Sequence, residues 1–312
     1  MSLENFDQML KLIPQRKEPL RVVLAGSDGE NKLKGLFDAQ KAGFAQPVLV
    51  GDRAKTITLL EKLGLADEPY TLVETLPGHS IPDVAVDVIR CGDGDILMRG
   101  NLLTQAFLIA CVSSTHGLRR DRELMSHVSL SSMPEYPKLL GLADMAVIID
   151  PDIARKRAII INTVTALKAL GYEKPVLAML ALVEKGTFQM EDIVEAQSLV
   201  FEHRRRPLAD CELWGPISYD LIISKEAARL KDYDCPYTGG GFDAIIAPEL
   251  TTANTLAKSW MIHAHSTVCG AVLGATVPIA LNSRSASARE SFLSVAFAAI
   301  LHKYYGEIGW LK

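Results

Sequence analysis

The sequence has few cysteines, and no spacing organises them into a site. The five cysteines are odd in number and scattered, and none of them forms a Cys-x-x-Cys pair. Such a set lacks the framework of a disulfide-rich secreted domain and the ligands of a zinc ribbon. We therefore expect free thiols and a reducing, cytoplasmic location.

Long apolar runs and a large net charge are missing as well. No uninterrupted apolar stretch approaches the roughly 18 residues that a membrane span needs. The N-terminal residues, MSLENFD, lack the basic start and the apolar run of a signal peptide. The balance of 33 Lys and Arg against 37 Asp and Glu gives a net charge of −4. We expect no membrane partner and no nucleic-acid partner held by bulk electrostatics.

What the chain does contain is an alternation of short apolar runs and longer helical patterns over most of its 312 residues. Predicted strands cover residues 20–25, 47–50, 95–98, 146–149, 176–180, 244–247 and 277–281. Predicted helices cover residues 31–42, 54–63, 102–112, 153–170, 190–201 and 251–263, and a last helix ends near Tyr305. The alternation predicts βαβ units, mostly parallel sheets covered on both faces and an α/β fold class. The length fits one large domain or two medium ones.

The strongest candidate site follows the last predicted strand, at residues 282–290, NSRSASARE. Ligands of parallel sheets bind beyond the carboxyl ends of the strands. Backbone N–H groups at a helix start, together with hydroxyls and a guanidinium, suit an oxyanion or a phosphate. Ser287 and Glu290 also fit the S-x-x-E capping box, so Glu290 has a structural role open to it besides a chemical one.

A second strand-to-helix junction lies at residues 98–104, MRGNLLT. Gly100 allows a close approach of the backbone, and Arg99, Asn101 and Thr104 offer donors to an anion. The alternative is a polar turn in which Asn101 caps the helix that follows.

Other motifs are weak or absent. The glycine-rich residues 237–241 precede a strand, whereas a dinucleotide fingerprint has its glycines after one. His263 and His265 are two residues apart and point in different directions on a helix. Neither His-Glu-x-x-His nor G-x-S-x-G occurs. The basic run at residues 203–206 is typical of a solvated face.

Four segments together resemble the phosphotransacetylase and phosphotransbutyrylase family, in particular its phosphate butyryltransferase-like branch. These segments are residues 96–101, ILMRGN; 126–129, SHVS; 215–220, GPISYD; and 277–284, VPIALNSR. The resemblance implies reversible transfer of a short-chain acyl group, acetyl to butyryl, between coenzyme A and inorganic phosphate. Coenzyme A is then a substrate, and neither a resident cofactor nor a metal is expected.

The resemblance also implies a fold of two α/β/α domains of the isocitrate/isopropylmalate dehydrogenase-like type, with an active site in the cleft between them and a homodimeric assembly. Residues 1–125 and 274–312 are expected to form the first domain, which carries the Ser-Arg loop. Residues 126–273 are expected to form the second.

The resemblance assigns roles to individual residues. Arg284 binds the phosphate, Ser283 hydrogen-bonds the reacting carbonyl or phosphate oxygen, and Glu290, seven positions after Ser283, is the candidate base. The residues expected to bind substrate are Arg99, Gly100, Asn101, Thr104, His127, Ser129 and Asn254.

Two alternatives remain open at this point. Departures from the family pattern, such as TAN at residues 252–254 where relatives usually have Ala-Gly-Asn, are compatible with a non-catalytic or altered-substrate paralogue that binds coenzyme A and phosphate. A metal- and NAD-dependent decarboxylating dehydrogenase of the same fold is the other. It would need clustered acids for Mg²⁺; Asp243 and Glu249 are available, but no paired carboxylates at helical spacing stand near a predicted strand end.

Overall fold

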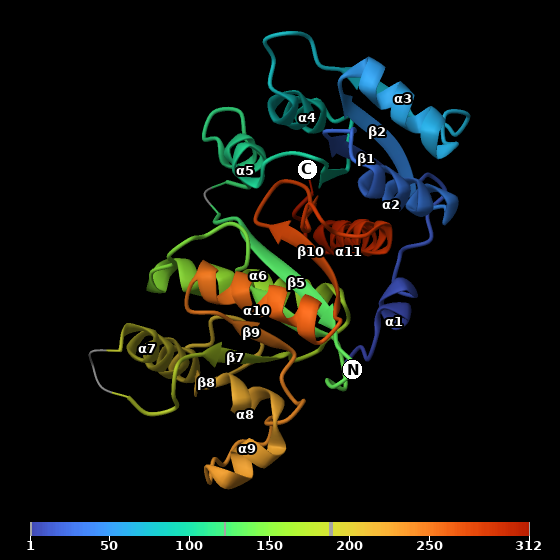
Figure 1. The fold of residues 1–312 in the computed structure, drawn as a ribbon. Helices are drawn as coiled ribbons and strands as arrows, with labels where there is room; N and C mark the ends of the chain where they lie inside the picture. The colour runs from blue at the N-terminus through green and yellow to red at the C-terminus, as the bar shows by residue number, and fades with distance from the viewer. Residues whose placement is uncertain (1, 122, 187–189, 312) are drawn as a thin grey trace. The chain divides into compact units, whose positions relative to one another are not determined.

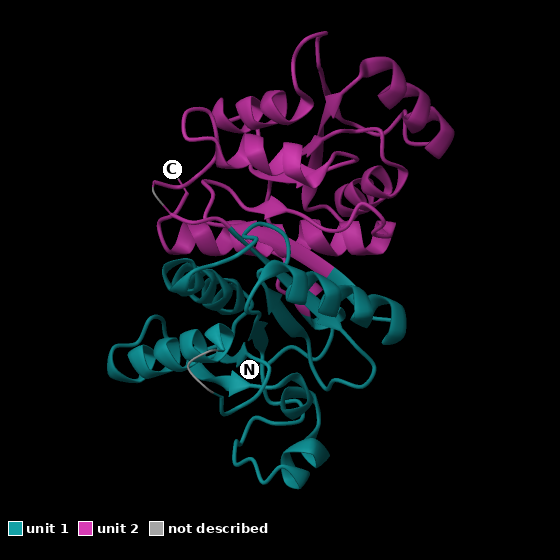
Figure 2. Ribbon diagram, turned by 60° about the vertical axis from the view of Figure 1, so that its left-hand side comes forward, with its two compact units in different colours: residues 1–8, 126–268 teal, residues 9–125, 269–312 magenta. Residues whose placement is uncertain are grey.

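The computed structural model describes residues 2–121, 123–186 and 190–311. The chain forms a mixed α/β fold that divides into two compact units (Figures 1 and 2). Unit 1 contains residues 1–8 and 126–268, and unit 2 contains residues 9–125 and 269–312. Among the described residues, no helix is long and apolar enough to cross a membrane.

Unit 2 is built on a largely parallel sheet with the strand order β3-β2-β1-β4-β11-β10. Neighbouring strands from β3 to β11 run parallel, and β10 pairs antiparallel with β11. The strands of this sheet are β1 (Leu20–Ala25), β2 (Ala45–Gly51), β3 (Thr71–Glu74), β4 (Ile96–Arg99), β10 (Thr267–Leu273, mostly in this unit) and β11 (Ile279–Ala280).

Helices cover this sheet and connect its strands. They are α2 (Glu30–Lys41), α3 (Arg53–Leu63), α4 (Ile81–Arg90), α5 (Thr104–Val112) and α11 (Ala288–Glu307), and the short α1 (Phe6–Leu10) precedes them. Helices α2 and α11 pack closely, because a Cβ at Gly35 would lie 2.6 Å from the Ala288 carbonyl oxygen. This packing brings the start of α11 against the first turns of α2.

The strands of unit 1 follow the order β5-β6-β9-β7-β8. Its strands are β5 (Ser126–Ser132), β6 (Leu140–Ala143), β7 (Val176–Leu180), β8 (Glu212–Ile217) and β9 (Ala244–Ile246). Strands β6, β9, β7 and β8 run parallel, and β5 pairs antiparallel with β6. The core of this unit includes Leu142, Ala178 and Ile245 from neighbouring strands and Trp260 from a helix.

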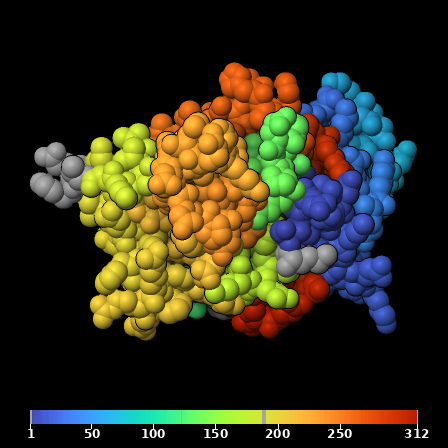
Figure 3. Space-filling view, turned by 90° about the horizontal axis from the view of Figure 1, so that it is seen from below, coloured from blue at the N-terminus to red at the C-terminus, as the bar shows by residue number. Residues whose placement is uncertain are grey.

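The helices of unit 1 are α6 (Ile153–Ala169), α7 (Glu191–Arg205), α8 (Tyr219–Ile223), α9 (Lys225–Leu230) and α10 (Leu250–His263). Local capping explains where several of them begin. Asp152 accepts a hydrogen bond from the Arg155 N–H at the start of α6, and Glu249 accepts two at the start of α10. Helices α8 and α9 form an outward surface of the unit (Figures 1 and 3).

The α/β class and most of the predicted elements are confirmed, and two strands match at both ends, β1 and β7. The strand predicted at residues 146–149 is wrong. The strand in this region is β6, which ends at Ala143, and the apolar residues after it form a loop around the Asp144 carboxylate. That carboxylate accepts the N–H groups of Ala146, Val147 and Ile148, so these groups do not enter a sheet ladder.

Candidate active site

The two predicted junctions of unit 2 come together because their strands are neighbours. Arg99 lies beside Ala25 in the parallel register of β1 and β4, and Met98 lies beside Ala280 in that of β4 and β11. The segments that follow these parallel strands therefore leave the sheet at the same edge. This edge carries the 98–104 junction and the loop at residues 282–287.

Arg99 is the central side chain at this edge. It is only 2% exposed. Its guanidinium donates to the Thr104 hydroxyl at 2.5 Å, to the Leu102 carbonyl at 3.3 Å and to the Asn282 carbonyl at 2.5 Å. Its Nε has no hydrogen-bond partner among the described residues. Burial and then the nearby positive charge of Arg284 lower the pKa of Arg99 to about 10, so the side chain remains charged at neutral pH.

Lys32, from the first turn of α2, is a second buried cation at this edge, and the sequence analysis missed it. Its side chain is 2% exposed, and its ammonium donates to the Asn282 side chain and, at 2.8 Å, to the Ser283 carbonyl oxygen. Burial and then the charge of Arg99 lower the pKa of Lys32 to about 7, against an opposing effect of Glu290. No sequence signal marked it, since a lysine in the first turn of a helix is usually solvated.

The Ser-Arg pair follows Asn282 directly. Ser283 and Arg284 are exposed, and the Ser283 hydroxyl lies 2.9 Å from the Ser285 hydroxyl. Two buried cations from β4 and α2 thus hold the turn, from which the exposed Arg284 offers a third positive charge to solvent. The arrangement can bind an anion with donors from several elements.

Glu290 forms the predicted capping box at the start of α11. The Ser287 hydroxyl accepts the Glu290 N–H at 3.2 Å, and the Glu290 carboxylate accepts the Ser287 N–H at 2.8 Å. The capping role is therefore confirmed. Its negative charge also favours the protonated form of Lys32 and so opposes the lowering of the Lys32 pKa.

The remaining residues of the first junction have defined places. A Cβ at Gly100 would lie 1.9 Å from the Gly26 carbonyl oxygen, so only glycine fits between β4 and the loop after β1. The Asn101 N–H donates to that same carbonyl at 3.2 Å. Asn101 does not cap α5, contrary to the alternative considered from sequence, because α5 begins at Thr104 with Leu103 at its N-cap.

His127, Ser129 and Asn254 belong to unit 1. His127 and Ser129 are buried on β5, and the Ser129 hydroxyl donates to the Leu142 carbonyl at 3.2 Å. The Asn254 side chain donates to the Met145 carbonyl at 3.3 Å. These contacts give Ser129 and Asn254 places in the fold of unit 1, and a role of the three residues in substrate binding stays a prediction.

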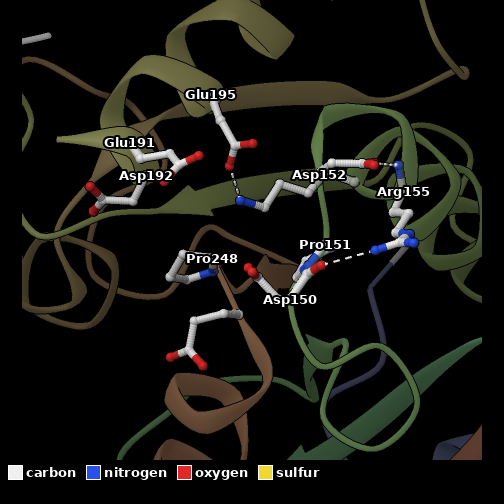
Figure 4. A pocket seen from close by; sticks show the side chains of 10 residues that line it. Asp150, Pro151, Asp152, Arg155, Glu191, Asp192, Glu195 and Pro248 are labelled. Carbon is white, nitrogen blue, oxygen red and sulfur yellow. Dashed lines mark hydrogen bonds and ion pairs between the residues drawn. The ribbon is translucent and has the colours of Figure 1, made fainter. Parts of the chain in front are cut away.

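Unit 1 also contains a pocket of about 340 Å³ with a lining of mostly acidic side chains (Figure 4). The acidic residues that line it are Asp150, Asp152, Glu191, Asp192, Glu195 and Glu249. Several have partners: Lys156 is ion-paired with Glu195, Asp152 accepts the Arg155 N–H at 2.8 Å, and Asp192 accepts the Leu182 N–H at 2.9 Å.

The acids considered as Mg²⁺ ligands have structural partners. Asp243 receives hydrogen bonds from the Lys138 ammonium at 2.5 Å and from the Val176 N–H at 2.8 Å. Glu249 caps α10 through the N–H groups of Thr251 and Thr252. In the part of the chain that the structure describes, no group of three or more His, Cys, Asp or Glu side chains is arranged to hold a metal ion.

Comparison with known proteins agrees with this description. Residues 79–299 match the family model described as "Phosphate acetyl/butaryl transferase". The chain is 33% identical to the phosphate acetyltransferase of Rhizobium meliloti over 90% of its own length and 89% of that protein. It is 28% identical to the phosphate butyryltransferase of Clostridium acetobutylicum, over 96% and 98% of the two chains.

The fold agrees with that of a solved relative. The crystal structure of a branched-chain phosphotransacylase from Enterococcus faecalis V583 superposes with a TM-score of 0.76 and 26% identity, over 91% of this chain and 99% of that one. Both kinds of comparison thus bear out the resemblance found in the sequence. The chain belongs to the phosphate acetyl/butyryl transferase family, which is a family of acyltransferases.

Proposed function

We propose that the protein transfers a short-chain acyl group, acetyl to butyryl, reversibly between coenzyme A and inorganic phosphate, and that the Ser283–Arg284 turn with Arg99 forms its phosphate pocket. The observation that supports this location of the phosphate pocket is the buried Arg99 guanidinium, which donates a hydrogen bond to the Asn282 carbonyl directly before the turn. The family supports the reaction, and the cationic edge of unit 2 supports the location.

The reaction needs three kinds of group. A thiol with a pKa of about 8.5 is mostly protonated at neutral pH, so a base must take its proton as the sulfur attacks the carbonyl carbon. Donors must stabilise the developing oxyanion, and cations must stabilise the leaving phosphate. The C–S bond forms, the C–O bond to the phosphate breaks, and the electron pair leaves on the phosphate oxygen.

The residues of unit 2 fit these three tasks. Arg284 and Arg99 stabilise the phosphate, and the Ser283 hydroxyl donates to the reacting carbonyl or phosphate oxygen. Glu290 accepts the thiol proton, in addition to its role as a cap. Asn101 and Thr104 line the pocket beside Arg99, and Gly100 allows the backbone to turn there.

The finer parts of the proposal follow from the family. His127, Ser129 and Asn254 contribute to substrate binding. Residues 1–125 with 274–312 and residues 126–273 form two α/β/α domains of the isocitrate/isopropylmalate dehydrogenase-like type. The protein works as a cytoplasmic homodimer with coenzyme A as a substrate and no permanently bound cofactor.

The proposal is tested by release of free thiol from acetyl-, propionyl- and butyryl-coenzyme A, each with and without phosphate. Arg284→Ala should lower phosphate-dependent release by roughly two to three orders of magnitude, the range seen when a donor to a transition-state charge is removed. Arg289→Ala is the matched control, because this neighbouring exposed arginine lies over the Phe292 ring at 5.3 Å. No release with any donor, from protein that still binds coenzyme A, would contradict the proposal and favour a binding protein.

A further inference from the structure

Lys32 occupies an unusual position for a lysine. It lies in the first turn of α2, yet its side chain is 2% exposed, whereas Lys34 on the same helix is exposed and paired with Glu30 at 2.7 Å. Among the described residues, Lys32 has no carboxylate within ion-pair distance, and its hydrogen-bond acceptors are neutral oxygens. A buried ammonium in such surroundings is costly unless an anion compensates it.

Lys32 forms its hydrogen bonds with two consecutive residues, Asn282 and Ser283. Lys32 donates to the Asn282 side chain and to the Ser283 carbonyl at 2.8 Å, and Arg99 donates to the Asn282 carbonyl at 2.5 Å. The Asn282 amide in turn donates to the Ser294 hydroxyl at 3.2 Å. Lys32 therefore fixes the backbone from which Ser283 and Arg284 extend.

The charges that act on Lys32 come from two other elements. Arg99 at the end of β4 disfavours the protonated amine, Glu290 on α11 favours it, and burial has the largest effect. On its own helix, Glu30 is occupied by Lys34 and Lys62. A bound anion between Arg99 and Arg284 would offset the repulsion, raise the pKa of Lys32 and keep it protonated.

We propose that Lys32 is a positioning residue that holds the Asn282–Ser283 turn and supplies an additional positive charge for the phosphate group, so that anion binding at this site is coupled to proton uptake by the lysine. The inference rests on the proposed function for the identity of the anion. The coupling itself is a property of binding and does not require turnover.

Sulfate is the suitable probe, because it has the shape of phosphate and does not titrate near neutral pH. Its binding is measured by calorimetry at pH 7.5 in buffers of different ionisation enthalpy, which gives the number of protons taken up. The wild type should take up a fraction of a proton per sulfate, and its affinity should fall as the pH rises from 6.5 to 8.5. In Lys32→Met we expect sulfate affinity to fall at least tenfold and the proton uptake to disappear.

Lys34→Met is the matched control and should bind sulfate within twofold of the wild type with the same proton uptake. If Lys32→Met does not fold, Lys32→Gln and the pH dependence of the wild type alone decide the question. Sulfate binding without proton uptake in the wild type, or an equal loss in both lysine variants, would overturn the proposal.

Turnover separates this inference from the function on which it rests. In an active enzyme, Lys32→Met should raise the KM for phosphate at least tenfold, with a smaller change in kcat. An inactive wild type that still couples sulfate binding to proton uptake would refute the acyl transfer and retain the role of Lys32. If the wild type is active and Lys32→Met leaves the KM for phosphate unchanged, the acyl transfer is retained and the role of Lys32 is refuted.

Discussion

Two charged regions of the molecule differ in how their charges are compensated. In the acidic pocket of unit 1, Lys156 is paired with Glu195, Asp152 caps α6 and Glu249 caps α10. At the cationic edge of unit 2, the partners of Arg99 and Lys32 among the described residues are hydroxyl, amide and carbonyl oxygens. The pKa of each of these two cations is lowered.

The contrast separates charges that are compensated by partners within the protein from charges whose partners are neutral. A buried ion pair or a capping carboxylate has its partners within the protein. Removing one partner therefore lowers the stability of the fold. Buried cations with neutral partners retain a net charge that an anion can neutralise, and perturbed groups of this kind cluster at functional sites. The number of charged residues is therefore a poor guide, since the acidic pocket has more of them than the cationic edge.

The strongest test of this contrast is Arg99→Met. We expect the kcat/KM for phosphate-dependent thiol release to fall roughly a thousandfold, because the change removes both the charge and the link to Asn282. Arg99→Lys keeps the charge but cannot reproduce the planar fork that reaches Thr104 and Asn282, so it should lose roughly ten- to a hundredfold.

The matched control lies in the acidic pocket. Arg155 donates to the Asp150 carbonyl at 3.2 Å, and Arg155→Met should leave kcat/KM within twofold of the wild type. Circular dichroism verifies that the variants are folded. If the folded Arg99→Met variant kept near wild-type turnover, the cationic edge would contribute no more to the reaction than the acidic pocket does.

The second test changes the acidic pocket itself. The Lys156 and Glu195 side chains are 5% and 13% exposed, so Lys156→Met leaves a carboxylate in a largely buried place. We expect the free energy of unfolding to fall by about 3 kcal/mol, measured by urea denaturation, with acyl transfer within twofold. Adding Glu195→Leu should restore most of the stability. Loss of acyl transfer in the folded single variant would instead give the acidic pocket a part in the reaction.

Part of this contrast could be read from the sequence. The apolar runs that became β1 and β7 were bounded correctly, because hydrophobic pattern and the adjoining glycine or proline act locally. The Ser287–Glu290 box was recognised for the same reason. The shared location of Arg99 and the Ser283–Arg284 pair at one sheet edge is predictable, because the segments after neighbouring parallel strands leave the sheet at the same edge. Their role in binding stays a prediction.

What sequence could not give depends on contacts between distant segments. Residues 146–149 have the composition of a strand, but the Asp144 carboxylate competes for their N–H groups. Lys32 becomes buried because α11 packs on α2 across Gly35, more than 250 residues apart in sequence. Neither effect leaves a local signature.

A third test uses the lowered pKa of Lys32. The native pKa is about 7 and the ordinary value is 10.5, so between these values the unfolded chain binds more protons than the native one. Stability should therefore rise with pH from about 7 to 10.5, and this gain is lost as the pH falls back to about 7. Relative to Lys32→Met, the wild type should gain roughly 2 kcal/mol, less than the full shift implies because a buried site relaxes and hydrates. Urea denaturation in buffers free of phosphate and sulfate measures it, and a flat difference between the two proteins would contradict the buried charge.

The last test separates the two roles of Glu290. Ser287→Ala removes the hydroxyl that caps α11 and leaves the Glu290 carboxylate in place, so we expect a loss of about 1 kcal/mol in stability and turnover within twofold. Glu290→Gln keeps an oxygen that can accept the Ser287 N–H but removes the base, so turnover should fall by roughly two orders of magnitude or more with little change in stability. If Glu290→Gln instead retained its turnover, Glu290 would act as a cap alone. Its carboxylate would then have a purely structural role, like the capping carboxylates Asp152 and Glu249 in unit 1. Another group would have to accept the thiol proton.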